Sequence, residues 1–294
     1  MTGAAPWLRR ALIGLPFVWL GVFFLLPLLI VAGISLTESA DAIPPFEPLV
    51  VIGPEGAIES NATLANYWQL AQSCLKVYAS SLGFAASTTL LCLLLGYPVA
   101  FAIARAPELW RPLLLFLVML PFWTSFLIRV YAWMALLQPS GLINRLLLAA
   151  GLIEAPVPLL YNAFSVQLGL VYSYLPFMIL PLYGSLSRLD ENLVEAAADL
   201  GARPWRVLFT VIVPLTLPGI AAGALLVFIP AVGEFVIPDL LGGPDTLMIG
   251  RLLWQEFFDN VDWPAASALA VALVAVVALP LLLAQRLLGR AGTA

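Results

Sequence analysis

Apolar residues gather into six long runs along the chain, and only two charged residues, Lys76 and Arg129, fall inside them. The runs lie at about 12–34, 74–104, 112–137, 163–184, 208–232 and 263–285. Each run is long enough for a helix to cross a bilayer, which takes about 20 predominantly apolar residues. The pattern therefore predicts an all-α membrane protein with six transmembrane helices.

A short charged segment at 190–206 stands between the fourth and fifth runs. Its apolar positions recur at helical spacing on one face, and its acidic positions recur every four residues on another. The apolar positions are Leu189, Leu193, Ala196, Ala197 and Leu200, and the acidic ones are Glu191, Glu195 and Asp199. This spacing predicts an amphipathic helix.

Residues suited to helix ends flank this segment. Asp190 can accept a hydrogen bond from a free backbone N–H at the start of the helix. Gly201 can adopt the left-handed conformation that ends a helix, and Pro204 is favoured in the first turn of the next one. We therefore expect a short helix, a sharp turn, and a new helix that enters the membrane.

The composition supports lipid as the solvent for most of the chain. Hydrophobic residues make up 62% of the 294 residues, charged residues make up 10%, and the mean hydropathy is +1.02. Soluble domains average roughly 25% charged residues. We therefore expect no soluble domain of any size.

Basic residues are concentrated in alternate loops, which predicts the orientation of the chain. Nine of the 13 basic residues fall on one side: Arg9, Arg10, Arg105, Arg111, Arg188, Arg203, Arg206, Arg286 and Arg290. That side is expected to be cytoplasmic, together with both termini. The first apolar run is longer than the roughly 7–15 residues of a signal peptide, so we interpret it as a retained helix.

The loop at about 35–72 is then external and carries only acidic charge. Its acids are Glu38, Asp41, Glu47, Glu55 and Glu59. Two interpretations stay open: an ordinary solvated loop, or an acidic vestibule that attracts cations.

Two side chains that enzymes often use for catalysis are absent or nearly absent, since the sequence has a single lysine and lacks histidine. Cys74 and Cys92 are the only cysteines. They lie 18 residues apart on one expected helix, about 27 Å at 1.5 Å per residue, too far to form a disulfide. The sequence has no phosphate-binding loop and no cluster suited to a metal. We therefore expect no catalytic residue, metal or cofactor in this chain, and no nucleic-acid partner; transport or scaffolding is favoured over catalysis.

The segment at 190–206 could lie on lipid or dock onto a partner. Helices that lie on the anionic cytoplasmic leaflet are usually rich in Lys and Arg, whereas this one is acidic. The small residues Ala196, Ala197 and Ala198 would let another protein surface approach closely. The pattern favours docking.

The letters EAAADLG followed by VIVP resemble the EAA motif of the permease subunits of binding-protein-dependent ABC importers. The matching residues are Glu195, Ala196, Ala197, Gly201 and Pro214, while Val211 and Val213 replace Ile and Leu. In that family the segment is the coupling helix, which sits in a groove of the ATP-hydrolysing subunit. The resemblance implies that coupling residues here are Glu195, Ala196, Ala197, Asp199, Gly201, Arg203 and Arg206.

Further stretches resemble the polyamine permeases of that superfamily. They are PFWTSFLIRVYAW (121–133), SGLIN (140–144), YSYLPFMILPLYGSL (172–186) and IPAVGEFVIPDLLGGPDTLMIGRLLWQEFF (229–258). The stretch ISLTESADAIPPF (34–46) is similar to the putrescine member. The resemblance implies a polyamine, putrescine foremost, as substrate.

The resemblance also implies the fold and the domain organisation. We expect the type I ABC importer permease fold, with a first helix and acidic external loop at 1–72, the transmembrane domain at 73–286 with its coupling helix at about 190–206, and a cytoplasmic tail at 287–294.

The partners follow from the same resemblance. They are a second, homologous permease in a heterodimer, two ATPase subunits that bind the ATP on the cytoplasmic face, and a periplasmic polyamine-binding protein. The assembly is expected in the bacterial inner membrane.

A substrate path for a polycation needs carboxylates and aromatic faces, the latter worth about 0.5–2 kcal/mol per cation–π contact. Glu234 and Asp239 are candidates, and Pro230, Gly233 and Pro238 around them predict an interrupted helix, tolerated where it lines a cavity. The aromatic candidates are Trp123, Tyr131 and Tyr174, for which anchoring at the lipid interface is the alternative.

Two further features bear on gating and assembly. Arg129 is expected near the outer interface, where it could pair with Glu234 or Asp239. Gly219 and Gly223 have the G-x-x-x-G spacing that lets membrane helices approach closely. We expect this face to contact the second permease; packing within the same chain is the alternative.

Functions of other classes are weighed against this one. An ion channel or secondary transporter would show more ionisable residues within its helices, and a scaffold would not need the prolines at 214, 218, 230 and 238. An importer permease for another small solute, such as spermidine, is the nearer alternative.

Overall fold

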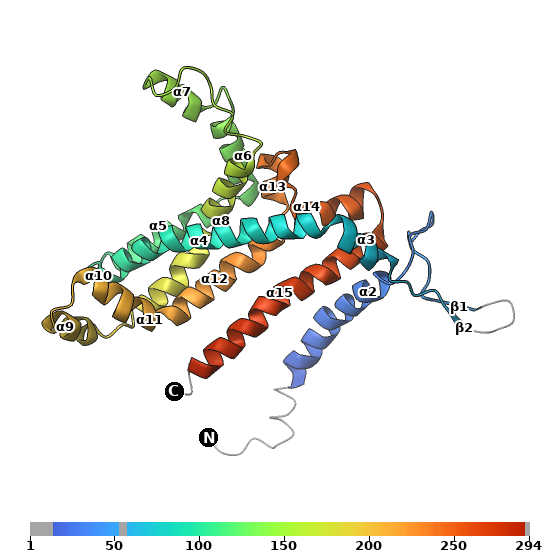
Figure 1. The fold of residues 1–294 in the computed structure, drawn as a ribbon, viewed down its shortest axis with the longest axis horizontal. Helices are drawn as coiled ribbons and strands as arrows, with labels where there is room; N and C mark the ends of the chain where they lie inside the picture. The colour runs from blue at the N-terminus through green and yellow to red at the C-terminus, as the bar shows by residue number, and fades with distance from the viewer. Residues whose placement is uncertain (1–13, 53–57, 292–294) are drawn as a thin grey trace, which may run out of the picture. The chain divides into compact units, whose positions relative to one another are not determined.

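The computed structural model describes residues 14–52 and 58–291, with side chains for residues 14–51 and 60–278. The chain divides into two compact units. Unit 1 contains the residues up to Leu75 together with Leu253–Val276, and unit 2 contains Lys76–Leu252 and the residues from Val277 onward. Figure 1 shows the helices of both units with their labels.

Unit 1 contains the first helical span, a hairpin and the start of the last helix. Its elements are η1 (Gly21–Leu25), α2 (Leu26–Ile34), β1 (Val50–Ile52), β2 (Ile58–Ser60), α3 (Ala65–Ser73), η5 (Gln255–Asp259) and α15 (Trp263–Ala291) up to Val276. The strands β1 and β2 pair antiparallel, with Val51 opposite Glu59. The first helix and the two strands all come from the segment expected to hold the first helix and the external loop.

Polar contacts hold the end of α2 against α3 within unit 1. The Asn66 side-chain amide donates to the carbonyl oxygens of Ser35 (3.0 Å) and Thr37 (2.8 Å), and the hydroxyls of Ser35 and Tyr67 are 2.6 Å apart. These bonds satisfy carbonyls that a helix end leaves free. The ring of Trp263 stacks on Phe257, with centroids 5.2 Å apart.

Unit 2 carries the remaining helices. They are α4 (Leu75–Arg105) from Lys76, α5 (Arg111–Met119), η2 (Leu120–Trp123), α6 (Phe126–Leu137), α7 (Leu142–Ala149), α8 (Ala163–Leu186), α9 (Glu191–Asp199), α10 (Pro204–Val207), η3 (Leu208–Ile212), α11 (Val213–Leu215), α12 (Leu217–Val232), α13 (Val236–Leu241), η4 (Pro244–Thr246) and α14 (Ile249–Trp254) up to Leu252. In Figure 1, α9 and α10 lie at one end of this unit, and α6 and α13 lie towards the other.

The helices long and apolar enough to cross a membrane number four among the described residues, or five if a bent pair counts as one span. The count of six transmembrane helices expected from the sequence is therefore not confirmed. The run at 112–137 is divided into α5 with η2, and α6, by an extended residue at Thr124. Pro121 lies just before this division and lacks the N–H that a continuing helix would use.

The run at 208–232 bends by 69° between Pro204–Leu215 and Leu217–Val232. Pro214 and Pro218 flank the bend, and each removes a helical N–H donor. Thr216 lies at the bend and is fully buried. Its hydroxyl donates to the Ile212 carbonyl (2.9 Å) and is 3.0 Å from the Tyr97 hydroxyl of α4, so the bend is closed by side-chain hydrogen bonds.

The core of unit 2 is the packing of α12 against α8. A Cβ placed at Gly219 would collide with Ser185, and one at Gly223 would lie 2.7 Å from the Met178 sulfur. The G-x-x-x-G face therefore packs within the same chain, and the expectation that it contacts a second permease is wrong. Small residues here let two membrane helices approach closely.

A polar cluster joins α8 to α4 within this core. The Ser87 hydroxyl donates to the Gln167 side-chain carbonyl (2.9 Å), and the Gln167 amide donates to the Thr88 hydroxyl (2.8 Å). Each polar group thus finds a partner within the chain, as groups that face lipid cannot.

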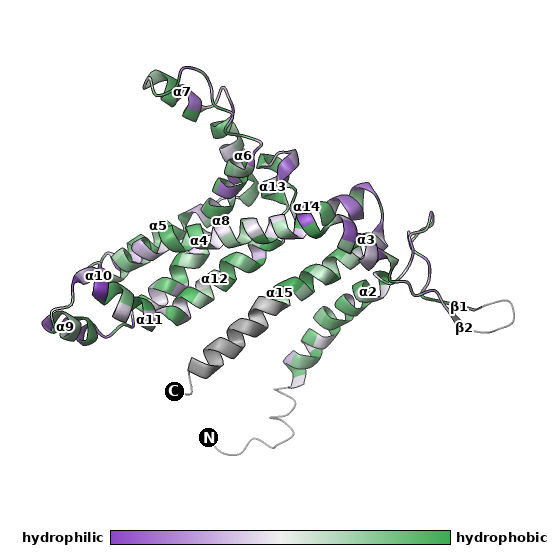
Figure 2. Ribbon diagram, in the orientation of Figure 1, coloured by the Kyte–Doolittle hydropathy of each residue, from purple (hydrophilic) through white to green (hydrophobic). Residues whose placement is uncertain are grey.

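The charged segment folds as its pattern predicts. Asp190 precedes α9, and its carboxylate accepts from the Asn192 backbone N–H at 3.0 Å. Gly201 follows α9 with φ +78°, and Pro204 is the first residue of α10. Figure 2 shows a strongly hydrophilic patch on α10, whereas α12 is coloured mainly as hydrophobic.

The α8–α12 packing predicts the effect of one substitution. Gly223→Val should force α12 away from Met178, at a cost of about 1–3 kcal/mol for overpacking, and lower the thermal unfolding midpoint of the purified protein in detergent. Gly184→Val is the matched control, because a Cβ at Gly184 meets nothing within 4 Å. Equal midpoints for Gly223→Val and the unmodified protein would show that this contact does not stabilise the fold.

Candidate functional site

The chain leaves the helical conformation at Gly233–Phe235, between α12 and α13. Pro230 lies within α12 and Pro238 within α13, so the interruption falls between the two prolines. The interruption expected from the sequence is confirmed. Glu234 lies inside it, half-buried.

Three hydrogen bonds hold the Glu234 carboxyl group. The Tyr174 hydroxyl of α8 donates to one oxygen at 2.5 Å. The backbone N–H groups of Phe235 and Val236 donate to the other, at 3.2 and 3.0 Å. The last two bonds satisfy donors at the start of α13, as a capping side chain would. The carboxyl group is therefore fixed both to its own backbone and to α8.

Helix α14 packs directly on this interruption. A Cβ placed at Gly250 would collide with the Gly233 carbonyl oxygen and lie 2.7 Å from that of Glu234, so only glycine fits without a shift. The first residue of α14, Ile249, donates its N–H to the buried Ser81 hydroxyl of α4 at 2.7 Å. The interruption is thus enclosed by α8 and by α14, which α4 holds in place.

The second candidate carboxylate, Asp239 on α13, forms an ion pair with Arg251 on α14. The nitrogen Nε of Arg251 lies 3.1 Å from the Asp239 oxygen, in the geometry of a charge pair rather than an aligned hydrogen bond. Asp239 is 52% exposed and Arg251 is 26% exposed. The sequence offered no signal for Arg251 beyond its charge.

Arg129 of α6 lies among aromatic rings instead of pairing with either acid. Its guanidinium carbon is 5.1 Å from the centre of the Phe122 ring and 5.6 Å from that of Phe126. Its nitrogens Nε and Nη1 are buried and have no hydrogen-bond partner in the part of the chain that the structure describes. The expected pair with Glu234 or Asp239 is therefore absent: Asp239 pairs with Arg251, and Glu234 accepts from Tyr174.

A row of rings runs from Arg129 to Glu234. Phe122 meets Phe177 edge to face at 5.0 Å, and Phe177 lies 6.2 Å from the Tyr174 ring. The aromatic candidate Tyr174 is thus part of the site. Phe122 and Phe177 were missed, since nothing in the sequence distinguishes them from other apolar residues of their runs.

The other two aromatic candidates lie on the surface. Trp123 is 76% exposed and meets Phe116 edge to face at 5.8 Å, and Tyr131 is 53% exposed. Exposed aromatic side chains of this kind suit the lipid interface. Among the described residues, neither Trp123 nor Tyr131 forms a ring contact or hydrogen bond with Glu234, Tyr174 or Phe177.

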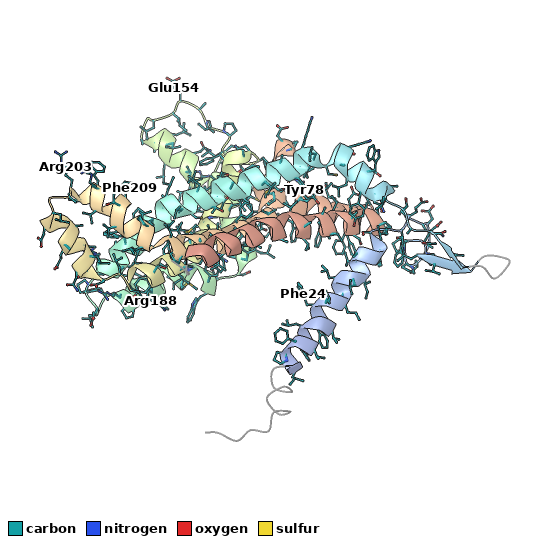
Figure 3. The ribbon with its side chains drawn as sticks, turned by 60° about the horizontal axis from the view of Figure 1, so that its bottom comes forward. Phe24, Tyr78, Glu154, Arg188, Arg203 and Phe209 are labelled. Carbon is teal, nitrogen blue, oxygen red and sulfur yellow. The ribbon has the colours of Figure 1, made fainter. Side chains whose placement is uncertain are left out.

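The residues expected to serve in coupling form a second surface, at the α9–α10 end of unit 2. Those on and beside α9 are Glu195, Ala196, Asp199, Gly201, Arg203 and Arg206, all exposed, and Ala197, half-buried. Leu193 and Leu200 are 47% and 89% exposed, so the surface also carries an exposed apolar strip. Figure 3 shows Arg203 and Arg188 at this end of the unit.

Metal-binding clusters are not found in the described residues, where no three His, Cys, Asp or Glu side chains gather. Cys74 and Cys92 are free thiols.

Comparison with known proteins shows what this arrangement is similar to. Residues 93–291 match the family described as the binding-protein-dependent transport system inner membrane component. The chain is 42% identical over 276 residues to the spermidine/putrescine transport system permease protein PotB of Escherichia coli strain K12, covering 92% of this chain and 96% of that protein. It is 41% identical to PotB of Haemophilus influenzae, covering 92% and 91%.

Solved structures show the same fold at low identity. A bacterial ABC transporter involved in alginate import aligns with a TM-score of 0.62 and 19% identity, covering 97% of this chain and 96% of that one. The alginate transporter in complex with a periplasmic protein gives 0.66 and 17%, covering 95% and 93%. The fold is that of type I ABC importer permeases, and the chain belongs to the family of binding-protein-dependent transport system inner membrane components.

Proposed function

We propose that this chain is the membrane-spanning permease subunit of an ATP-driven polyamine importer, with putrescine as its substrate. The observation that carries the proposal is the Glu234 carboxyl group, held in a helix interruption beside a row of aromatic rings. The 41–42% identity to PotB proteins over 92% of the chain supports the same substrate class.

The site suits a primary ammonium group. A carboxylate offers about four lone-pair positions, and three donors already reach Glu234. One position is left for a further N–H. The faces of Tyr174 and Phe177 would add cation–π attraction of about 0.5–2 kcal/mol each, which offsets part of the cost of desolvating the ammonium.

Arg129 limits the site at its other end. Its guanidinium already occupies the faces of Phe122 and Phe126, where it would repel a second cation. A substrate ammonium is therefore favoured only at the Glu234 end of the row. Asp239 and Arg251 are proposed to brace α13 on α14 at the outer gate as a partly exposed ion pair; a fully exposed pair contributes about 0.2–1 kcal/mol.

Energy is proposed to enter through α9. The sequence has no phosphate-binding loop, so the ATP is expected on two partner subunits. The exposed strip of Leu193 and Leu200 beside Ala196 offers an apolar surface that such a subunit could bury. A second, homologous permease and a periplasmic polyamine-binding protein complete the assembly, with the contact to the permease placed away from Gly219 and Gly223.

The α9–α10 end is proposed to face the cytoplasm, with both termini on the same side. Arg105, Arg111, Arg188, Arg203 and Arg206 support this orientation through the excess of positive charge on cytoplasmic loops. Arg9 and Arg10, which contributed to the same expectation, lie outside the described residues.

A channel or secondary transporter is the alternative of another class, and spermidine is the alternative substrate. Family membership favours the importer over the channel. Uptake that continues without ATP hydrolysis would favour the channel, and a lower KM for spermidine than for putrescine would favour the other substrate.

The substrate proposal predicts a difference between the two carboxylates. Glu234→Gln should lower kcat/KM for labelled putrescine by about 10- to 100-fold, because a charged hydrogen bond is worth about 1.5–3 kcal/mol. Asp239→Asn should have a smaller effect. Uptake is measured in vesicles at matched amounts of protein, with Glu154→Gln, on an exposed loop labelled in Figure 3, as the control. Uptake by Glu234→Gln equal to that of the control would place the substrate site elsewhere.

The coupling proposal predicts that Gly201→Val uncouples the transporter. The φ of +78° at Gly201 is one that β-branched residues rarely adopt, so the exit from α9 should change direction. We expect substrate-stimulated ATP hydrolysis of the reconstituted complex to be largely lost. Ala202→Val places the same β-branched side chain at the next residue, which has no positive φ, and should retain stimulation. Full stimulation in both Gly201→Val and Glu195→Arg would rule out this surface.

A further inference from the structure

A polar cavity lies near α9 and takes no part in the proposed transport path. Its volume is about 310 Å³, and its lining includes Phe101, Arg105, Arg111, Ser187 and Glu191. These residues come from four segments of unit 2: the end of α4, the start of α5, the residue after α8 and the start of α9. The volume is at the low end of the roughly 300–1,000 Å³ typical of small-ligand sites.

The cavity lies at the level where two membrane spans end. Arg105 is the last residue of the span Leu75–Arg105, and Leu186, which also lines the cavity, is the last residue of the span Ala163–Leu186. In the turn after α4, Leu109 is 87% exposed and Trp110 is 54% exposed. Tryptophan is enriched where a protein meets the lipid headgroups. The ends of the two spans therefore put the cavity at the depth expected for the lipid headgroups.

The two arginines leave donors free at this cavity. Arg111 donates its Nε to the Ala106 carbonyl oxygen at 2.8 Å, which fixes the guanidinium and leaves its two terminal nitrogens for another acceptor. Arg105 lies over the Phe101 ring, 5.1 Å from its centre. Neither forms an ion pair with any residue that the structure describes. Glu191 is the one carboxylate of the lining, so two positive charges face a single negative one.

We propose that this cavity binds the phosphodiester headgroup of an anionic membrane lipid, such as phosphatidylglycerol. Two guanidinium groups provide the forked donors that phosphate oxygens accept, and the Ser187 hydroxyl adds a further donor. Basic pockets between membrane helices on the cytoplasmic side are suited to anionic headgroups. Glu191 belongs to the first turn of α9, so the lipid sits against the base of the helix that is proposed to carry the coupling.

The charges that line the cavity predict opposite effects on lipid affinity for two variants. The double variant Arg105→Gln/Arg111→Gln should weaken binding of phosphatidylglycerol by about tenfold or more, since each basic residue near an anionic lipid contributes to attraction. Glu191→Gln removes the one repulsive charge and should tighten binding several-fold. A misfolded protein would not bind more tightly, so the second variant separates loss of the site from loss of the fold.

The test is a lipid titration of the purified transporter, with all the subunits that co-purify, followed by native mass spectrometry. The probes are phosphatidylglycerol, phosphatidylcholine and inorganic phosphate. Arg188→Gln is the matched control, because Arg188 lies between Ser187 and Leu189 in the turn after α8 but is not part of this cavity's lining. We expect phosphatidylglycerol to bind more tightly than phosphatidylcholine, and Arg188→Gln to leave this preference unchanged.

Three results would overturn the proposal. Equal binding of phosphatidylglycerol by the double variant and the unmodified transporter would show that the arginines do not form the site. Displacement of the lipid by an equal concentration of inorganic phosphate would assign the cavity to free phosphate. Loss of the ATPase subunits from the double variant, with lipid binding unchanged, would assign it to a subunit contact.

Discussion

The hydrogen bond from Tyr174 to Glu234 joins the interruption between α12 and α13 to α8, in the core of unit 2. Backbone that leaves a helix inside a membrane finds no water, so its polar groups need partners from the protein. Glu234 provides two of these partners, because its carboxyl group accepts from the backbone N–H groups of Phe235 and Val236. It also accepts from the Tyr174 hydroxyl. The same bonds turn the carboxyl group towards α8, where a row of aromatic rings begins. The constraint that stabilises irregular backbone therefore also positions the charge proposed to meet the substrate.

The surrounding helices depend on this arrangement through close contacts. Gly250 lets α14 rest on the carbonyl groups of the interruption, and Gly223 lets α12 rest on α8 beside Met178. A second bend, at Thr216, separates α12 from α10 and α11 and is closed by Tyr97. The fifth apolar run is thus divided, and α12 lies between the bend at Thr216 and the interruption at Glu234. A displacement of α9 and α10 at one end could reach Glu234 at the other through α12, which is packed on α8 along its length.

The sequence predicted the features that depend on local chemistry. The order Asp190, Gly201, Pro204 specifies where α9 begins, where it ends and where α10 starts, and Gly233 between Pro230 and Pro238 specifies the interruption at Glu234. The sequence did not predict features that depend on which surfaces meet. The spacing of Gly219 and Gly223 permits close packing against any helix, and only the fold shows that the helix is α8. The pair Arg251 and Asp239 and the pair Phe122 and Phe177 each join different helices, so these contacts depend on how the helices pack. The domain limits at 72 and 286 stay predictions. The straight run at 112–137 was misread for a different reason, since average hydropathy does not register the effect of one proline.

The central claim is that Tyr174 acts on transport through Glu234, and a double-mutant cycle on putrescine uptake tests it most directly. The variants are Tyr174→Phe, Glu234→Gln and both together, compared by kcat/KM at matched amounts of protein in the membrane. If Tyr174 serves to position the carboxyl group, the double variant should transport no worse than Glu234→Gln alone. If the two losses multiply, Tyr174 and Glu234 act independently, and the account of a single positioned carboxylate is contradicted.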